Sequence, residues 1–246
     1  MIRTLDYNAF DREFWNTHLE SFVPEEIYDM HAHLWTEQGQ EHLGPVDSVL
    51  RMEVDFPGLL DWSARVFPDR KCHFLFLGTP IPGVDAISQN TWLAQEIAAD
   101  PASSGAMIVT PETTREELDA GLKDKFDAVK PYRFFAPDPR NAGITDFLPE
   151  RLLEIIDSHK KAVMLHLSIP EGADSPRNIA DLQYLTNKYP DIKWILAHCA
   201  RAFNSLFLEK SIHKLKHLPN IWYDTSAVND LYTHFLLLKH YQSMIY

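Results

Sequence analysis

The sequence predicts an α/β fold, a (β/α)8 TIM barrel whose eighth strand is incomplete within the chain. Seven short apolar runs, rich in β-branched and aromatic residues, alternate with stretches of helical periodicity. The runs are apolar on both faces, as expected for parallel strands that helices cover. The length of 246 residues also matches the roughly 250 residues of such a barrel. A doubly wound open sheet is the alternative fold.

The elements can be placed along the chain from their boundary residues. Hydroxyl, amide or proline side chains that favour helix starts precede four helical stretches, at residues 88–90, 113–114, 149 and 175–176. The expected strands are the apolar runs at residues 27–34, 72–78, 106–110, 128–135, 162–167, 192–197 and 220–225. Strands and helices therefore alternate along the chain.

Two segments lie outside this alternation. Residues 8–22 have the pattern of an amphipathic helix that leads into the first strand. Residues 36–70 form an insertion with Gly44-Pro45, Pro57-Gly58 and Pro68-Asp69 turns, and we expect it to overhang the mouth of the barrel. No linker or internal repeat marks a boundary, so we expect residues 1–246 to form a single domain.

The composition of the chain disfavours some classes of binding partner. A formal net charge of −12 opposes binding to nucleic acid or to an anionic membrane. The sequence has neither a signal peptide nor an apolar run long enough to span a membrane, so a cytoplasmic location is expected. The two cysteines, Cys72 and Cys199, lack the spacing of a disulfide framework or a thiolate zinc site. We expect a small-molecule substrate and leave a homo-oligomer open.

The segment DMHAH places His31 and His33 at the end of the first predicted strand. Because side chains on a strand alternate between faces, Asp29, His31 and His33 are expected on one face. That strand end belongs to the rim where barrel enzymes assemble their active sites, and two neutral imidazoles there can share one divalent ion. Two core histidines bonded to the backbone are the alternative interpretation.

Two further histidines favour the metal interpretation. His166 ends the run AVMLHLS and His198 ends the run KWILAHCAR, one strand-helix-strand unit later. Burying polar groups at matching depths on separate strands is costly unless they share a ligand. The sequence therefore predicts a metal site at this rim.

The segments DMHAH (29–33), MLHLS (164–168), ILAHCAR (195–201) and NIWYDTSA (220–227) together resemble the amidohydrolase superfamily. The likeness is to its amidohydrolase-related branch, which includes the aminocarboxymuconate-semialdehyde decarboxylase-like enzymes, and extends from about residue 22 to the end. It implies that His31, His33 and His166 bind one divalent metal ion, with zinc preferred and manganese as the alternative. It also implies that His198 contacts substrate or a second metal.

The sequence departs from the family pattern at its end. Family members carry a strand-eight aspartate that binds metal and transfers protons, whereas this chain stops at Ser243-Met244-Ile245-Tyr246. Asp224 is no obvious substitute, because it belongs to strand seven and a hydrogen-bonded strand-end carboxylate explains it. We expect the chain to continue, with an aspartate within about the next five residues.

Two basic residues are candidates for substrate binding. Lys130 lies in an otherwise apolar strand, before Pro131, and we expect its ammonium to bind a substrate carboxylate. Carbamylation of Lys130 between two metals, as in some superfamily members, is the alternative. Arg201, three residues after His198, is a second anion-binding candidate, and a surface ion pair at a helix start explains it equally well.

These residues predict a metal-dependent hydrolase that acts on a small carboxylate-bearing substrate through metal-activated water, with His198 as proton carrier. A metal-dependent non-oxidative decarboxylase is the first alternative, because the same ion can organise a carboxylated substrate. The second alternative is a barrel without catalysis that serves as a binding module.

Overall fold

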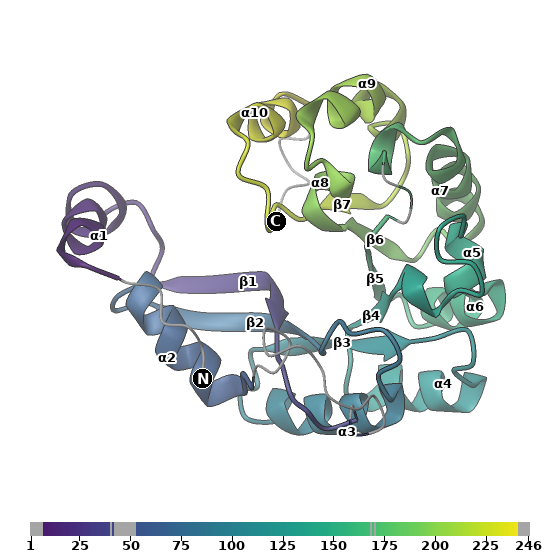
Figure 1. Cartoon of the computed structure of the whole chain (residues 1–246), viewed down its shortest axis with the longest axis horizontal. Helices are drawn as coiled ribbons and strands as arrows, with labels where there is room; N and C mark the ends of the chain where they lie inside the picture. The colour runs from purple at the N-terminus through teal and green to yellow at the C-terminus, as the bar shows by residue number, and fades with distance from the viewer. Residues whose placement is uncertain (1–6, 40, 42–52, 168, 170, 241–246) are drawn as a thin grey trace. The chain divides into compact units, whose positions relative to one another are not determined.

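The computed structural model describes residues 7–39, 41, 53–167, 169 and 171–240. Its strands follow one another in the sheet in chain order (Figure 1) and alternate with helices, as the sequence predicts. The strands are β1 (Glu26–His33), β2 (Lys71–Leu77), β3 (Ser104–Val109), β4 (Ala128–Pro131), β5 (Ala162–Leu165), β6 (Lys193–Leu196) and β7 (Ile221–Tyr223). The α-helices are α1 (Ala9–Phe14), α2 (Phe56–Val66), α3 (Ala86–Ile97), α4 (Arg115–Asp124), α5 (Ile144–Phe147), α6 (Glu150–Ser158), α7 (Pro176–Lys188), α8 (Ala197–Arg201), α9 (Ser205–Leu215) and α10 (Leu231–His240).

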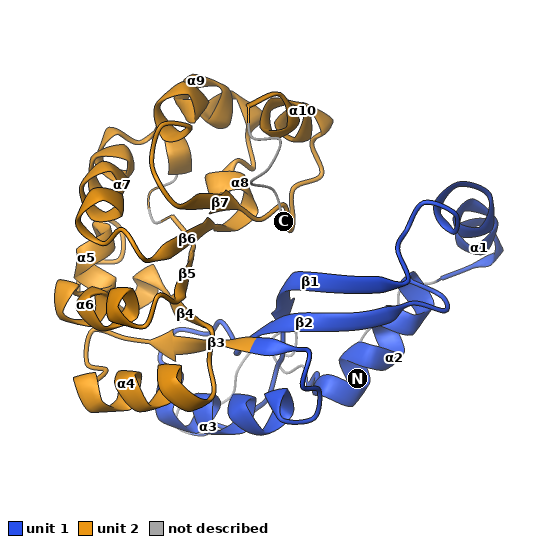
Figure 2. Cartoon of the chain, turned by 180° about the vertical axis from the view of Figure 1, so that it is seen from behind, with its two compact units in different colours: residues 1–104 blue, residues 105–246 orange. Residues whose placement is uncertain are grey.

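The chain divides into two compact units, residues 1–104 and residues 105–246 (Figure 2). The single domain expected from the sequence stays a prediction. In the first unit, β1 pairs with β2 in parallel, and the buried Phe74 and Phe76 of β2 pack against Phe56 of α2. The carboxyl ends of β1 and β2 therefore lie side by side.

The second unit is a run of parallel pairs from β3 to β7. Helices α4, α6, α7 and α9 lie along one side of these strands (Figure 2). Strand residues such as Val129, Val163, Trp194 and Tyr223 are completely or almost completely buried. Because all neighbouring strands in this unit are parallel, their carboxyl ends lie at one edge of the sheet.

The predicted helix starts agree closely with the structure. The Thr114 side chain caps α4 in a reciprocal capping box with Glu117, and the Ser175 side chain caps α7 ahead of Pro176. Helix α3 begins earlier than expected, at Ala86, because the Asp85 carboxylate accepts hydrogen bonds from the first backbone N–H groups. Local capping chemistry thus sets these boundaries.

Three elements differ from the prediction. Strand β4 ends at Pro131 instead of residue 135, because proline has no N–H to donate to the sheet and residues 133–135 form the 3-10 helix η3 (Arg133–Phe135). The helix predicted at residues 8–22 is α1 followed by the π-helix η1 (Trp15–Leu19). In β1 the pairing register shifts between Asp29 and Ala32, which interrupts the strict alternation expected for Asp29, His31 and His33.

Parts of two predicted segments lie outside the described residues. The predicted insertion at residues 36–70 contains α2 and a bridge between Trp35 and Val54, and residues 40 and 42–52 are not described. Of the predicted start of strand eight, HYQSMIY, only His240 is described, and it ends α10. Among the described helices, none combines the length and the apolar character that a membrane crossing requires.

A largely buried hydrogen bond between His73 and Asp100 in the first unit predicts a pH dependence of stability. His73 Nδ1 lies 2.7 Å from the Asp100 carboxylate, which also accepts from Ser103. Burial raises the pKa of Asp100, but the hydrogen bonds from His73, Ser103 and Ala102 outweigh it and hold that pKa below its usual value. A carboxyl group with a lowered folded-state pKa stabilises the fold above its unfolded pKa, and this stabilisation is lost as the pH falls through the folded pKa.

Asp100→Asn is therefore expected to lower the free energy of unfolding by about 1–2 kcal/mol at pH 7. The difference from wild type should shrink as the pH falls below about 4. Urea denaturation across this pH range measures it, with Asp61→Asn as the control, since that exposed pair with Arg65 is worth less than about 1 kcal/mol. Equal losses for the two variants at pH 7 would contradict the assignment.

Candidate active site

The carboxyl end of β1 carries a paired imidazole site. His31 Nε2 and His33 Nε2 lie 3.3 Å apart, and both rings are half-buried. His33 Nδ1 lies 2.9 Å from the carbonyl oxygen of Gly78, just after β2. A carbonyl only accepts, so Nδ1 of His33 carries the hydrogen and Nε2 of the neutral ring keeps its lone pair. The neighbouring strand thus selects the tautomer that can bind a metal through Nε2.

The separation of the two Nε2 atoms suits a shared metal ion. Two nitrogen ligands at 2.0–2.1 Å from one tetrahedral ion lie about 3.3 Å apart. The observed distance between His31 Nε2 and His33 Nε2 has this value. The backbone supports the arrangement, because the N–H of His31 donates to the Asp29 carboxylate at 2.9 Å instead of continuing a regular strand pattern. The residues therefore fit the metal that the sequence predicts.

His198 is held in an unusual backbone turn after β6. His198, Cys199, Ala200 and Arg201 all have φ between 53° and 62°, a left-handed turn that costs non-glycine residues about 1–2 kcal/mol each. The N–H of Cys199 donates to the carbonyl of Asp224 at 2.7 Å, which ties the turn to the residue after β7. Strain of this kind persists only where surrounding contacts enforce it.

The orientation of His198 is fixed by Ser226. His198 Nδ1 lies 2.9 Å from the Ser226 carbonyl oxygen and 3.0 Å from its hydroxyl. Nδ1 therefore carries a hydrogen and donates it to the carbonyl, whether the ring is neutral or protonated. His198 can gain or lose a proton at Nε2 without turning its ring.

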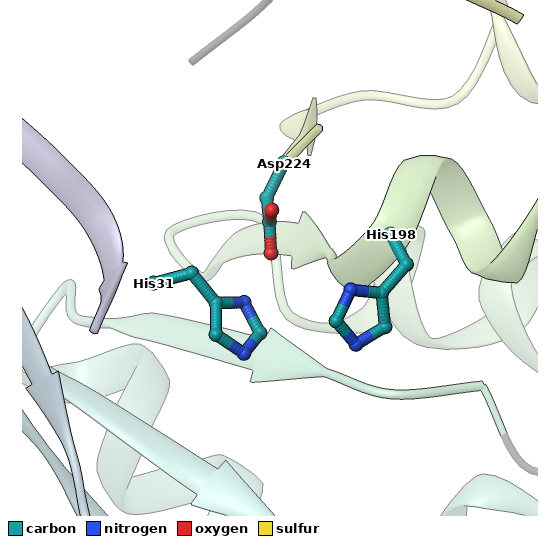
Figure 3. Close-up of side chains that lie close together, drawn as sticks. All are labelled: His31, His198 and Asp224. Carbon is teal, nitrogen blue, oxygen red and sulfur yellow. The ribbon is translucent and has the colours of Figure 1, made fainter. Parts of the chain in front are cut away.

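Asp224 is the site residue that the sequence left unassigned. It is 3% exposed, and its carboxylate accepts the Ser226 N–H at 2.6 Å, as expected for a hydrogen-bonded strand end. Its carboxylate also lies within 4.8 Å of a ring nitrogen of His198 (Figure 3), so its negative charge can stabilise the protonated imidazole. Its position at the carboxyl end of β7 was the feature that could have identified it.

His166 lies just after β5 and stacks edge-on against His198, with ring centroids 5.3 Å apart. Burial, followed by the charges of Lys130, His198 and Arg201, lowers the pKa of His166 to about 3. His166 is therefore neutral at physiological pH, which is the form that binds a metal.

The two predicted basic residues occupy different environments. Lys130 is 1% exposed, and burial lowers the pKa of its ammonium to about 8, although the Asp224 charge raises it. Arg201 is half-buried and donates to the Ile169 carbonyl at 3.0 Å. Burial, followed by the charge of Arg133, lowers the pKa of Arg201. The charges of Lys130 and Arg201 both lower the pKa of His166, so these two cations lie near the histidines of the second unit.

The structure therefore brings the predicted residues together in two sets. His31 and His33 belong to the first unit, and Lys130, His166, His198 and Arg201 belong to the second, with Asp224 added. Cys72 and Cys199 are buried free thiols. Burial and the charge of Asp224 raise the pKa of Cys199 to about 12, so its thiol is protonated at neutral pH.

Comparison with known proteins identifies similar sequences and folds. The sequence pattern of a family described as amidohydrolase matches residues 28–243. A comparison with curated proteins finds no match. An uncharacterised TIM-barrel protein from Bordetella bronchiseptica is similar in structure, with a TM-score of 0.55 and 14% identity, over 87% of this chain and 80% of that one. The chain thus has the predicted TIM-barrel fold.

Three other solved structures carry names that describe a reaction. A 5-carboxyvanillate decarboxylase from Novosphingobium aromaticivorans with bound manganese has a TM-score of 0.62 and 12% identity, over 89% of this chain and 84% of that one. A dihydroxybenzoic acid decarboxylase from a Polaromonas species, also with manganese, has a TM-score of 0.57 and 15% identity, over 89% and 84%. A 4-oxalomesaconate hydratase from Rhodopseudomonas palustris has a TM-score of 0.56 and 18% identity, over 87% and 78%.

The buried Lys130 ammonium predicts a stability cost. The pKa of Lys130 is about 8 in the folded protein, so this lysine loses its proton at a lower pH there than in the unfolded chain. Between about pH 8 and 10.4 the unfolded chain binds more protons, and the free energy of unfolding therefore rises with pH. Lys130→Met removes the buried charge and is expected to stabilise the metal-free protein by roughly 2–3 kcal/mol at pH 7. The gain should narrow toward pH 10, as followed by chemical denaturation. A variant that is less stable at pH 7, or a gain independent of pH, would contradict the burial of a charged amine.

Proposed function

Because this chain belongs to the amidohydrolase family, we propose that it is a metal-dependent decarboxylase, which removes CO2 from a small carboxylic acid without an oxidant. The family match covers residues 28–243 and supports a metal-dependent enzyme. Two of the similar structures named above are decarboxylases with bound manganese, and the third is a hydratase. These names favour decarboxylation over the hydrolysis that was the main expectation from the sequence.

The metal assignment rests on the His31–His33 pair, whose Nε2 atoms lie 3.3 Å apart, and on the hydrogen bond of His33 Nδ1 to Gly78, which leaves Nε2 of His33 as the metal-binding nitrogen. We propose that His31, His33 and His166 bind one divalent ion. A bound divalent ion supplies a positive charge that polarises a substrate oxygen and stabilises the electron pair left when a C–C bond breaks. Three neutral imidazoles suit zinc, and the two similar structures make manganese the alternative.

His198 is the proposed proton carrier. When CO2 leaves, its electron pair stays on the substrate carbon, and that carbon needs one proton. A protonated His198 can donate it from Nε2, while Nδ1–H stays bonded to Ser226, and a proton from solvent then restores the imidazolium. Asp224, within 4.8 Å of the ring, stabilises the protonated state by its negative charge.

The metal assignment predicts about one divalent ion per chain in the purified protein. His31→Ala and His33→Ala are each expected to lower metal affinity at least about tenfold, since each removes an imidazole ligand. Metal content after dialysis, measured by mass spectrometry, checks this, with His159→Ala as the control because that ring pairs with Asp119 outside the site. A folded wild type that binds no metal would support the alternative of a binding module.

The reaction assignment predicts CO2 release from the metal-loaded protein with carboxylated phenols such as 2,6-dihydroxybenzoate. His198→Asn is expected to lower kcat by about 10²–10⁴-fold, because it removes the proton carrier while keeping a similar shape. His213→Asn, on the exposed face of α9, serves as the control. Full turnover in His198→Asn, or conversion of substrate without CO2, would overturn this role or this reaction.

A further inference from the structure

Two buried polar groups, Lys130 in strand β4 and Tyr132 just after that strand, point to a ligand. Lys130 is 1% exposed and Tyr132 is 7% exposed. Within the described part of the chain, neither the Lys130 ammonium nor the Tyr132 hydroxyl has a hydrogen-bond partner. Most buried polar side chains have such a partner, so two unsatisfied groups, two residues apart, require an explanation.

The two groups lie on the same side of the strand. The backbone stays extended through Tyr132, with φ −122° and ψ 131°, so residues 130 and 132 share a face. The Lys130 ammonium lies 5.5 Å from the centroid of the Tyr132 ring. The Lys130 charge acts on His166 and the Asp224 charge acts on Lys130, which places this face toward the candidate site of the second unit.

The chemistry of the pair selects the ligand. An ammonium offers three donors and no acceptor, and a buried phenol offers one more donor. Burial raises the pKa of Tyr132, so its hydroxyl stays protonated. A cluster of donors with one positive charge excludes a metal ion and favours an anionic oxygen, because charge-assisted hydrogen bonds are the stronger kind. A carboxylate has two oxygens for these two donors.

We propose that Lys130 and Tyr132 form an oxyanion subsite that binds the carboxylate of the substrate. The proposal rests on the proposed function in taking that carboxylate to be the substrate's. Protein atoms cover both donors in this structure, so the carboxylate reaches them when the covering side chains move. Satisfying a buried ammonium recovers a large part of its desolvation cost, and this offsets the movement.

Isothermal titration with benzoate and with its uncharged analogue benzamide tests the subsite in the full-length, metal-loaded protein. We expect benzoate to bind at least about tenfold more tightly than benzamide, and Lys130→Met to abolish this difference. Tyr132→Phe should weaken benzoate binding about threefold to tenfold, because it removes one donor. Lys130→Arg, which keeps the charge, should retain part of the preference.

Matched controls separate this subsite from general effects of the substitutions. Lys161→Met removes a lysine that already pairs with Asp127, and Tyr189→Phe removes a buried hydroxyl already bonded to Glu150. Both should bind benzoate as the wild type does. Benzoate binding that is equal in wild type and Lys130→Met would overturn the subsite.

The same titration after chelation of the metal distinguishes this proposal from the proposed function. Benzoate binding that survives metal removal and is lost in Lys130→Met supports the subsite, even if the protein releases no CO2. Intact CO2 release in Lys130→Met, with unchanged KM, would overturn the subsite and leave the decarboxylase assignment standing.

Discussion

The parallel alignment of neighbouring strands determines where the candidate site residues lie. In each unit it puts the carboxyl ends of adjacent strands at one edge, and the residues that follow those ends supply the chemistry. His33 is the last residue of β1, and His198 and Asp224 lie just beyond the ends of β6 and β7. Helices on one side of the strands leave that edge for polar side chains.

Backbone carbonyl groups fix the tautomer and the ring orientation of two of these histidines. Gly78 accepts from His33 and Ser226 accepts from His198, and in both rings this leaves Nε2 as the nitrogen that can bind metal or exchange a proton. The left-handed turn after β6 belongs to the same arrangement, because its Cys199 N–H is bonded to Asp224. The strained backbone at residues 198–201 and the buried, unsatisfied amine of Lys130 both lower the stability of the fold. Features that lower stability in this way are typical of functional sites.

Sequence reasoning anticipated the elements whose causes are local. The caps at Thr114 and Ser175 and the strand-end histidines follow from side-chain chemistry within a few residues. The register shift in β1, the left-handed turn at residues 198–201 and the role of Asp224 depend on contacts with other strands, which propensity cannot show. From the sequence alone, Asp224 can be interpreted only as a strand-end carboxylate, whereas in the structure it is buried and lies within 4.8 Å of a ring nitrogen of His198.

The metal site proposed above consists of His31, His33 and His166. X-ray absorption spectroscopy of the zinc-loaded, full-length protein tests it most directly, because imidazole rings give a characteristic multiple-scattering pattern around the absorbing metal. We expect three imidazole nitrogens at about 2.0–2.1 Å and no sulfur, with one imidazole fewer in His166→Ala. A zinc environment that contains sulfur, or one that His166→Ala leaves unchanged, would contradict it.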